Sequence, residues 1–361
     1  MKMPLNILHI NTEKTWRGGE RQAAFLISML PTHEFNSIIA APMHAPFAQK
    51  MVQSGKNVID FNMRGEWDLI AAFKLKKIIK QHAVKLIHAH SSHALGIAAL
   101  VKCMIPVTII ASRRVDFHLR KNIFSKWKYT RADRIIAVSD GIKQVLLSDG
   151  INEKYISVVK SGVRLNQHSE INTDTLKLKL SIPDDHKVVG IIGALAPHKD
   201  HHTFVESALK VIQICPKTTF LIVGEGGLKN EIEQHIRAKG MQSHIIMTGF
   251  RDDVMSIIQL LDIYVSSSYL EGLGTTTLDA MKFGIPVVAT NVGGIPEIVE
   301  HDNTGYLVPP RNPSALADRI IELLRNTPRA YEMGKNGMTK VRDFNIEYTV
   351  KQTADIYRSL T

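Results

Sequence analysis

The chain has 361 residues, of which 44% are hydrophobic and 22% charged, which is the composition of a globular protein long enough for two domains. No stretch approaches 18 uninterrupted apolar residues, and the first residues lack a long apolar run. We therefore expect neither a membrane-spanning helix nor a signal peptide. The two cysteines, Cys103 and Cys215, stand in apolar surroundings at unrelated positions, which disfavours a disulfide or a metal pair. The expected location is the cytoplasm.

The positive charge is concentrated in the first part of the chain. Residues 1–165 hold 25 Lys+Arg against 11 Asp+Glu, a net charge of +14, whereas the remaining residues carry −3 and bring the total to +11. Such an asymmetry predicts that the first half faces an anionic partner. An anionic membrane surface and nucleic acid both fit the charge. No nucleic-acid-binding motif accompanies it, so we expect no nucleic-acid partner.

The first half alternates short β-branched runs with amphipathic stretches, the pattern of parallel α/β units. Helical periodicity is present at about 20–30, 69–82 and 95–104. A loop ending in Gly18-Gly19 lies between the first strand and the first helix, and glycine has no Cβ to keep a ligand away from the backbone. The strands are predicted at 5–10, 37–41, 57–61, 86–88, 107–111 and 134–138.

The same rhythm restarts after a polar segment without strong periodicity. It predicts a helix at about 201–214 and strands at 187–193, 219–223, 245–248, 263–266 and 287–290. We therefore predict two Rossmann-like domains, 1–165 and 187–343, joined by a linker at 166–186 and facing each other across a cleft. The tail, about 344–361, is amphipathic and is expected to pack back on the first domain as a helix.

The stretch from Glu271 to Glu297 is the most informative part of the chain. It places the Glu271 carboxylate before a glycine turn, Gly272 to Gly274, and a second carboxylate, Asp279, inside the helix that the turn opens. A helix N-terminus offers unpaired N–H groups and partial positive charge, so it holds phosphate well. Carboxylates beside it accept hydrogen bonds from the hydroxyls of a sugar and a ribose. The combination predicts a nucleotide-sugar pocket.

The second half resembles the donor domain of family-4 glycosyltransferases, which are retaining enzymes of the GT-B fold. The first half resembles their acceptor domain more loosely. The motifs that carry the resemblance are GALAPHKD (193–200), VGEG (223–226), TGF (248–250), the block 271–297 and NTGYLV (303–308), with WRGG (16–19), HAH (88–90) and ADRIIAVS (132–139) in the first half.

The resemblance implies transfer of a sugar from a nucleotide diphosphate sugar, with retention at the anomeric carbon. By that resemblance Lys199 holds the diphosphate, Glu271 binds donor-sugar hydroxyls, Asp279 binds the ribose, and His90 lies near the reaction centre. Protein groups neutralise the diphosphate, so neither a metal nor another cofactor is expected. The remaining donor-binding candidates are Gly272, Leu273, Gly274 and Thr275 in the turn, with Phe250 and Arg251 near the base.

The chain departs from the family pattern at two positions. The second carboxylate is usually Glu and here is Asp279, one methylene shorter, so the ribose has to lie closer. Ala194 stands where the family often carries Arg, which removes one positive partner of the diphosphate. Both changes bear on donor affinity, and Lys199 is then expected to carry more of the charge.

His88 and His90 stand at the end of a predicted strand. We expect the two side chains to point to opposite faces of the sheet, with one of them structural and His90 facing the cleft. Because the family is thought to use a phosphate oxygen of the leaving group as its base, His90 is expected to position the sugar rather than to carry a proton.

The segment 113–129 interleaves cations with aromatic residues. It fits either a solvated basic face with core anchors or a contact with a membrane surface or an acceptor phosphate. With Gly18 and Gly19, the residues Arg113 and Arg114 are the candidates for an acceptor or phosphate loop. A second basic helical face follows from Lys74, Lys76, Lys77 and Lys80.

These observations predict a retaining glycosyltransferase acting on a cell-envelope lipid or polysaccharide acceptor, such as lipopolysaccharide, capsule or glycolipid, at the cytoplasmic membrane surface. Two alternatives stay open: another GT-B enzyme such as a sugar-nucleotide epimerase, and a non-catalytic nucleotide-sugar-binding subunit. A dinucleotide oxidoreductase is set aside, because neither first strand is followed by G-x-G-x-x-G.

Overall fold

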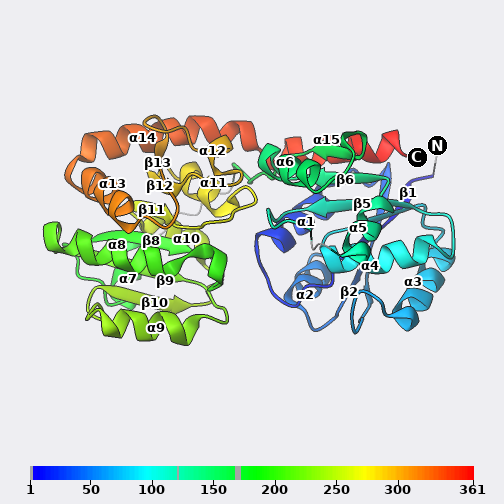
Figure 1. Ribbon diagram of the computed structural model, residues 1–361, viewed down its shortest axis with the longest axis horizontal. Helices are drawn as coiled ribbons and strands as arrows, with labels where there is room; N and C mark the ends of the chain where they lie inside the picture. Colours follow the sequence, from blue (N-terminus) through cyan, green and yellow to red (C-terminus); the bar gives the residue numbers. More distant parts are fainter. Residues whose placement is uncertain (1–2, 120–121, 167–171) are drawn as a thin grey trace. The chain divides into compact units, whose positions relative to one another are not determined.

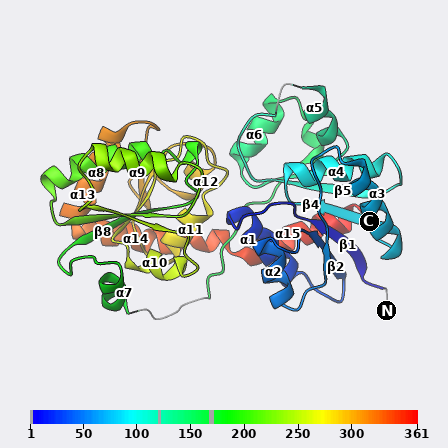
Figure 2. The same cartoon turned by 90° about the horizontal axis from the view of Figure 1, so that it is seen from below.

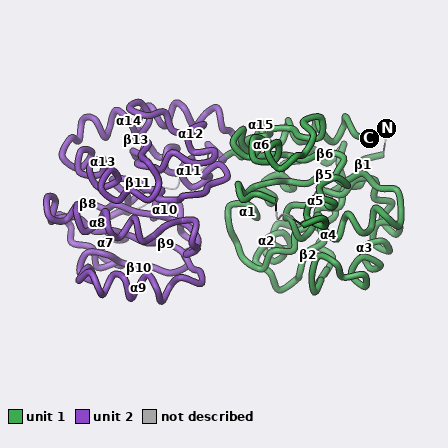
Figure 3. Tube along the Cα trace, viewed as in Figure 1, with its two compact units in different colours: residues 1–162, 346–361 green, residues 163–345 purple. Residues whose placement is uncertain are grey.

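The computed structural model describes residues 3–119, 122–166 and 172–361, and it divides into two compact units (Figure 3). Unit 1 comprises Met1–Gly162 and Ile346–Thr361, and unit 2 comprises Val163–Asn345. Each unit is built around one sheet in which all paired strands are parallel. The predicted fold class, two doubly wound α/β domains, is confirmed.

Unit 1 contains a seven-stranded sheet with the order β3-β2-β1-β4-β5-β6-β7. Its strands are β1 (Leu5–Ile10), β2 (Phe35–Ala41), β3 (Val58–Asp60), β4 (Leu86–Ala89), β5 (Thr108–Arg113), β6 (Arg134–Ala137) and β7 (Ile156–Val158). Its helices are α1 (Gly18–Met29), α2 (Pro46–Gln53), α3 (Leu69–Gln81), α4 (Ser92–Lys102), α5 (Ile123–Thr130), α6 (Asp140–Ser148) and the C-terminal α15 (Ile346–Ser359).

Helices α3 to α6 each begin where a short polar side chain caps them. Asp68 accepts from the N–H of Ala71 at the start of α3, and Ser91 accepts from the N–H of Ala94 at the start of α4. The strand between these two helices, β4, is buried on both faces, as expected when helices cover both sides of a parallel sheet. Helices α1, α2 and α15 cover one face and α3 to α6 the other (Figures 1 and 2).

The C-terminal helix α15 belongs to the core of unit 1, although it follows the whole of unit 2 in the sequence. Its buried residues Ile346, Val350, Ala354 and Tyr357 pack in one cluster with residues of α1, β1 and β4. The apolar positions recur at helical spacing, so one stripe of the helix is buried and its other side is exposed. This helix brings Tyr357 to the sheet of unit 1.

Unit 2 contains a six-stranded sheet with the order β10-β9-β8-β11-β12-β13. Its strands are β8 (Lys187–Ile192), β9 (Thr218–Val223), β10 (Ile245–Gly249), β11 (Ile263–Ser266), β12 (Val287–Thr290) and β13 (Gly305–Val308). Its helices are α7 (Thr173–Lys179), α8 (His201–Ile214), α9 (Lys229–Ala238), α10 (Val254–Leu260), α11 (Thr275–Lys282), α12 (Ile295–Ile298), α13 (Pro313–Arg325) and α14 (Thr327–Lys340). Helices α8, α9 and α13 lie on one face of the sheet and α10, α11 and α14 on the other (Figure 2).

Part of the segment predicted as a linker is structured. Residues 172–186 lie in unit 2, where Asn172 caps α7 and Leu176 is buried, so a capping residue and one apolar anchor suffice for a short helix that periodicity does not show. Residues 167–171 of that segment lie outside the described residues. Strands β7 and β13 were not predicted from the sequence. No described helix has both the length and the apolar character that crossing a bilayer requires.

Candidate functional site

The strand order of unit 2 reverses between the neighbouring strands β8 and β11. From β8 the later strands β9 and β10 follow toward one edge of the sheet, and from β11 the strands β12 and β13 follow toward the other edge. In open parallel sheets, ligands bind outside the carboxyl ends of the strands at this reversal, because the two connections leave toward opposite faces and open a crevice. The segment after β8 carries Lys199, and the segment after β11 carries Glu271. The structure therefore brings two of the predicted site residues to the position where the fold itself provides a site.

Lys199 and Glu271 form an ion pair between Nζ and Oε2. Ser268 Oγ donates to the same Oε2 atom at 3.2 Å, and Ser267 Oγ donates to the carbonyl oxygens of Lys199 and Asp200 at 2.9 Å each. The side chains of Lys199 and Glu271 keep 21% and 15% of their surface exposed, so a ligand can reach both. The sequence analysis missed Ser267 and Ser268, whose signal is their place directly after the switch strand β11.

Glycines make the close contact between the segments after β8 and β9 possible. Gly224 has a φ of +141°, and a Cβ there would lie 1.9 Å from the carbonyl oxygen of Gly193. A Cβ on Gly193 would lie 3.5 Å from Cε of Lys199, in ordinary contact with the lysine stem. A side chain at position 224 would therefore push apart the two loops that support Lys199.

The glycine turn predicted before the α11 helix is present. Gly274 has a φ of +87° at the N-cap position, and a Cβ there would lie 2.5 Å from Cδ1 of Ile295. No side chain caps α11 among the described contacts, so the N–H groups that follow Gly274, beginning with Thr275, are oriented as a helix N-terminus toward the site. The N–H of Gly294 donates to the carbonyl oxygen of Glu271 at 3.2 Å, which ties Gly272 and Leu273 to the next loop.

Asp279 is much more enclosed than Glu271, with 4% of the residue exposed. Close to both carboxylates lies Tyr264 on β11, a residue that the sequence analysis missed. Burial, followed by the charges of Glu271 and Asp279, raises the pKa of Tyr264, so its hydroxyl stays neutral. Unit 2 thus offers one accessible carboxylate, one enclosed carboxylate and a neutral hydroxyl beside a helix N-terminus.

Phe250 and Arg251 follow β10, two strands from β8, at the same carboxyl edge of the sheet. Phe250 is 48% exposed, as a ring available for stacking has to be. The guanidinium of Arg251 is held by Asp253, with Nε 2.7 Å from Oδ1. The structure places the two residues along the edge of the site, separate from the Lys199–Glu271 pair.

Unit 1 has the same topological feature between β1 and β4, where three histidines meet. His9 lies opposite His88 in the strand register, and Nδ1 of His9 is 3.0 Å from Nε2 of His90. The rings of His88 and His90 are stacked with centroids 4.1 Å apart. Our prediction that His88 and His90 point to opposite faces is wrong, because residues two apart in a strand share a face.

The three imidazoles are buried and neutral. Burial lowers the pKa of His9 to about 3, and burial together with the neighbouring positive charges lowers those of His88 and His90 well below their usual value. Hydrogen bonds with one another and with Ser37, Ser112 and Tyr357 involve five of the six ring nitrogens. The remaining one, Nδ1 of His90, has no partner among the described residues.

The histidines lie close enough for a metal ion, since their nearest nitrogens are within 4.8 Å of one another. The hydrogen bonds just described bring the same nitrogens together, because a neutral imidazole has one donor and one acceptor nitrogen and can bond to another neutral imidazole without a metal. These hydrogen bonds hold the neutral rings in fixed orientations.

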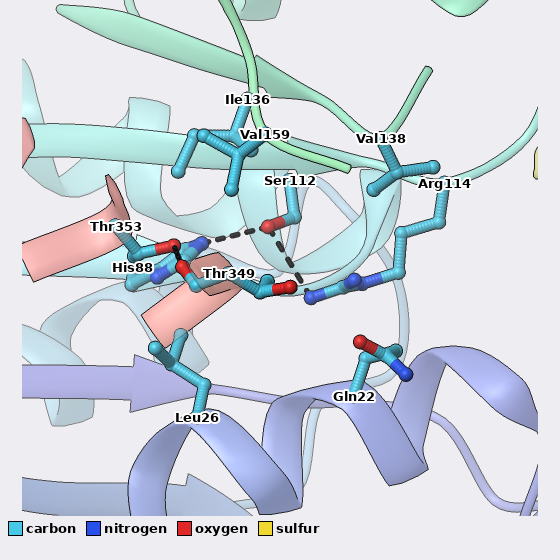
Figure 4. Close-up of a pocket in the computed structure, with 10 residues that line it drawn as sticks. All are labelled: Gln22, Leu26, His88, Ser112, Arg114, Ile136, Val138, Val159, Thr349 and Thr353. Carbon is cyan, nitrogen blue, oxygen red and sulfur yellow. Dashed lines mark hydrogen bonds between the residues drawn. The ribbon is translucent and has the colours of Figure 1, made fainter. Parts of the chain in front are cut away.

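His88 connects this cluster to the C-terminal helix and to Arg114. Its Nδ1 lies 2.5 Å from the hydroxyl of Tyr357, and its Nε2 lies 2.8 Å from Oγ of Ser112, to which Arg114 donates at 3.4 Å. Figure 4 shows His88, Ser112 and Arg114 around a small pocket, of roughly the size that a single water needs, lined also by Gln22, Thr349 and Thr353. The sequence analysis missed His9, Ser112 and Tyr357.

Of the four residues predicted for an acceptor or phosphate loop, three come together. Gly18 and Gly19 open α1, and a Cβ on Gly19 would lie 3.3 Å from Cδ of Arg114. Arg113 is directed elsewhere: it is buried and donates to the hydroxyl of Tyr129 at 2.9 Å and to the carbonyl oxygen of Phe117. Adjacent strand residues point to opposite faces, so a pair of arginines does not share one ligand.

Comparison with known proteins covers nearly all of the chain. A model described as Glycosyltransferase Family 4 matches residues 16–167, and one described as Glycosyl transferases group 1 matches residues 172–340. An uncharacterised glycosyltransferase of Methanocaldococcus jannaschii is 31% identical over 322 residues, 85% of this chain and 86% of its own length.

A second relative is the UDP-Gal:alpha-D-GlcNAc-diphosphoundecaprenol alpha-1,3-galactosyltransferase of Escherichia coli. It is 24% identical over 374 residues, 98% of this chain and 96% of its own length. Among solved structures, Anabaena HepE in complex with UDP and glucose has a TM-score of 0.88 at 21% identity, over 98% of this chain and 100% of HepE, which shows that the fold is shared. The chain belongs to the family-4, group 1 glycosyltransferases and is a glycosyltransferase of the GT-B fold.

Proposed function

We propose that this enzyme transfers a sugar from a nucleoside diphosphate sugar, with retention at the anomeric carbon, to a lipid-linked or polysaccharide acceptor of the cell envelope. The observation that carries the proposal is the partly exposed Lys199–Glu271 pair at the β8–β11 reversal, beside the uncapped start of α11. A cation, an anion and a helix N-terminus within one crevice match the diphosphate and the hydroxyls of such a donor.

Lys199 and Glu271 bind different parts of the donor in this proposal. The ammonium of Lys199 binds the diphosphate as a compact positive charge, and the first-turn N–H groups of α11 bind it from the other side. The carboxylate of Glu271 accepts hydrogen bonds from sugar hydroxyls, and Ser268 keeps its orientation. Asp279 accepts from the ribose, and the ring of Phe250 stacks on the base. Positive charge from the protein takes the place of a metal at the diphosphate. HepE, crystallised with UDP and glucose, supports this type of donor.

His90 contributes a hydrogen bond rather than a proton transfer. Its pKa lies well below 6.5 because it is buried next to other imidazoles, so it is neutral at pH 7. A neutral ring nitrogen can orient a sugar hydroxyl, and the leaving phosphate oxygen then serves as the base for the acceptor, as a retaining mechanism of this kind requires.

The acceptor is proposed to be presented at a membrane. The relative from Escherichia coli, aligned over 98% of this chain, is named for an acceptor built on diphosphoundecaprenol. Residues 1–165 carry a net charge of +14, which favours a polyanionic surface or a lipid diphosphate as the partner of unit 1.

The first test is a thermal-shift screen against UDP, GDP, ADP and their common sugar conjugates. A ligand that binds only the folded state raises the melting temperature by mass action, so one nucleotide family is expected to give a shift. Lys199→Ala is expected to lose the shift. Lys217→Ala, which removes an exposed ion pair with Asp185 in the same unit, is the matched control and is expected to keep it.

Product analysis separates the proposal from its alternatives. Sugar transfer requires an acceptor lipid extract and releases the nucleoside diphosphate, whereas an epimerase changes the nucleotide sugar without any acceptor. Binding without turnover against every extract would indicate a nucleotide-sugar-binding subunit. No shift with any nucleotide and no release of diphosphate would contradict the proposed donor site.

A further inference from the structure

Unit 1 exposes an apolar surface where the first turns of α3 and α5 meet. The side chains that form it are between 44% and 82% exposed, although large apolar side chains of a monomeric protein are usually exposed singly. We call it the α3–α5 surface, and it consists of Trp67, Leu69, Ile70, Phe73, Ile123 and Phe124.

Aromatic contacts join the two helices into one continuous surface. The ring of Trp67, just before α3, lies 5.0 Å from that of Phe124 and 5.5 Å from that of Trp127, centroid to centroid. Both aromatic partners are on α5. Trp67 packs edge to face on Phe124 and tilted on Trp127, so the aromatic contacts connect the start of α3 to α5.

Buried polar contacts hold this surface in place. Glu66, next to Trp67, accepts from Nζ of Lys128 on α5 at 2.6 Å and pairs with His93 at 2.9 Å. Lys128 also donates to the carbonyl oxygen of Ser92 at 3.1 Å. A Cβ on Gly96 would lie 2.8 Å from Cβ of Glu66, so this glycine of α4 makes room for the contact. The exposure of the apolar side chains is therefore a property of a fixed corner of the fold.

Exposed lysines continue the same face of α3. Lys74 and Lys77 follow Ile70 at positions i+4 and i+7, and Lys77 and Lys80 follow Phe73 at the same two spacings. The lysines therefore lie on the same stripes of the helix as Ile70 and Phe73, about one and two turns farther along. Lys126 is exposed on α5.

The acidic groups of this corner already have partners. Glu66 is bound by Lys128 and His93, and Asp68 caps α3 through the N–H groups of Arg64 and Ala71 at 3.0 Å each. The exposed lysines therefore give the rim of the α3–α5 surface a net positive charge.

We infer that the α3–α5 surface inserts into an anionic lipid bilayer, with its apolar tips among the acyl chains and its lysines at the headgroup phosphates. An apolar end next to a basic stretch is what the boundary between headgroups and acyl chains accepts, and long lysine side chains reach the phosphates while their stems stay in the apolar layer. The inference rests on the proposed function in one respect, the lipid-linked acceptor, which such binding would bring to unit 1.

Two other occupants fit the surface less well. A second copy docked through a two-fold axis would place the basic stripes of both copies near each other, which costs electrostatic energy. Nucleic acid is bound by phosphate contacts and by stacking on aromatic rings, and half of the α3–α5 surface is made of aliphatic side chains, Leu69, Ile70 and Ile123, which offer neither.

The test is co-flotation of the full chain with phosphatidylcholine vesicles, with and without phosphatidylglycerol. We expect binding only when the anionic lipid is present, with a blue shift of tryptophan emission as Trp67 enters the bilayer. The double variant Ile123→Ser, Phe124→Ser is expected to weaken binding roughly ten-fold or more. Lys74→Ser and Lys77→Ser are each expected to weaken it about five-fold, with a steep dependence on salt.

Matched controls lie in unit 2. Leu178→Ser removes an apolar side chain that is 78% exposed, and Lys335→Ser removes an exposed lysine; both are expected to leave vesicle binding unchanged. Equal binding of all variants, or no binding of the unmodified chain, would overturn the inference. A concentration-dependent dimer in sedimentation velocity that the Ile123→Ser, Phe124→Ser variant abolishes, without vesicle binding, would assign the surface to a second copy instead.

The donor thermal shift, measured without vesicles, keeps the two proposals apart. The surface variants are expected to retain it, since the α3–α5 surface lies in unit 1 and the donor groups lie in unit 2. Vesicle binding without any donor-induced thermal shift would refute the donor site and leave the membrane inference standing. A donor-induced shift without vesicle binding would refute the membrane inference and leave the donor site standing.

Discussion

In both units the strand order reverses at one point of the sheet, but the side chains that gather at this point are charged in unit 2 and neutral in unit 1. Unit 2 has an ion pair, Lys199 with Glu271, in loops that stay partly exposed. Unit 1 has three neutral imidazoles, buried and hydrogen-bonded to one another and to hydroxyl groups. The topology provides the position in both cases, and the side chains decide whether it binds charge or orients neutral groups.

The difference also determines how each unit responds to pH. Neutral buried histidines resist a protonation that the unfolded chain accepts readily. Unit 1 is therefore the part of the molecule whose stability depends on pH near neutrality.

The largest expected effect is acid destabilisation of unit 1. The pKa of His9 is about 3 in the folded state against 6.5 unfolded, and those of His88 and His90 are also well below 6.5. Between these values the unfolded chain binds more protons, so stability is lost as pH falls below 6.5. His9 alone would account for ~5 kcal/mol once the pH reaches its folded pKa.

Hydrogen exchange at pH 7 and pH 5, corrected for intrinsic rates, measures this loss region by region. Peptides from β1 and β4 are expected to lose more protection than peptides from β8 and β9. Among the described residues of unit 2, burial lowers the pKa of His201 to about 4 and also lowers that of His235, whereas unit 1 gathers three such histidines in one cluster. Equal losses in the two sheets would contradict the comparison.

Glu20 in unit 1 opposes the histidines and provides a second readout. Burial raises its pKa to about 7, so the folded state holds this proton at a higher pH than the unfolded state and gains stability as pH falls from 7 toward 4.5. Nearby Arg114 keeps its charge, since burial lowers its pKa only to about 10. The variant Glu20→Gln is therefore expected to make the acid loss of unit 1 steeper.

The second effect is on turnover, and it concerns unit 2. Glu271→Gln keeps the size of the side chain and removes the charge that pairs with Lys199 and that, under the proposed function, accepts hydrogen bonds from sugar hydroxyls. Loss of one such contact in a transition state is expected to lower kcat/KM about 100-fold, or ~2.7 kcal/mol. Glu231→Gln, a change at an exposed carboxylate of the same unit that pairs with His202, is the control and is expected to stay within two-fold. A Glu271→Gln enzyme as active as the control would remove Glu271 from the donor site.

How far the sequence predicts each site follows from how its residues are distributed along the chain. Lys199, Glu271 and Gly274 stand in contiguous motifs at strand ends, so these motifs and the family resemblance that they carry identify all three residues from the sequence. The hydroxyl that fixes His88 comes from Tyr357, 269 positions away on a helix separated from its unit by the whole of unit 2. No local pattern signals such a contact.

Neighbouring residues show the same limit on a smaller scale. Arg113 and Arg114 are adjacent and were predicted as one basic loop, yet one is held by Tyr129 and the other lies beside Ser112 and Gly19. His9 was missed because its partner His88 is found only once the register of β1 and β4 is known. The fold depends on patterns repeated along every strand, whereas the polar network of unit 1 depends on single contacts between distant elements.

The smallest expected effect concerns a single hydrogen bond in the polar network of unit 1. Tyr357→Phe removes the hydroxyl at Nδ1 of His88 and leaves a buried ring nitrogen without its partner, at an expected cost of ~1–3 kcal/mol of unfolding free energy. Tyr348→Phe on the same helix, where the residue is 56% exposed, is the matched control and is expected to cost less than ~0.5 kcal/mol. Denaturant unfolding gives both values. If the two substitutions cost the same, the hydroxyl of Tyr357 does not hold His88, and the imidazoles of unit 1 are positioned by packing alone.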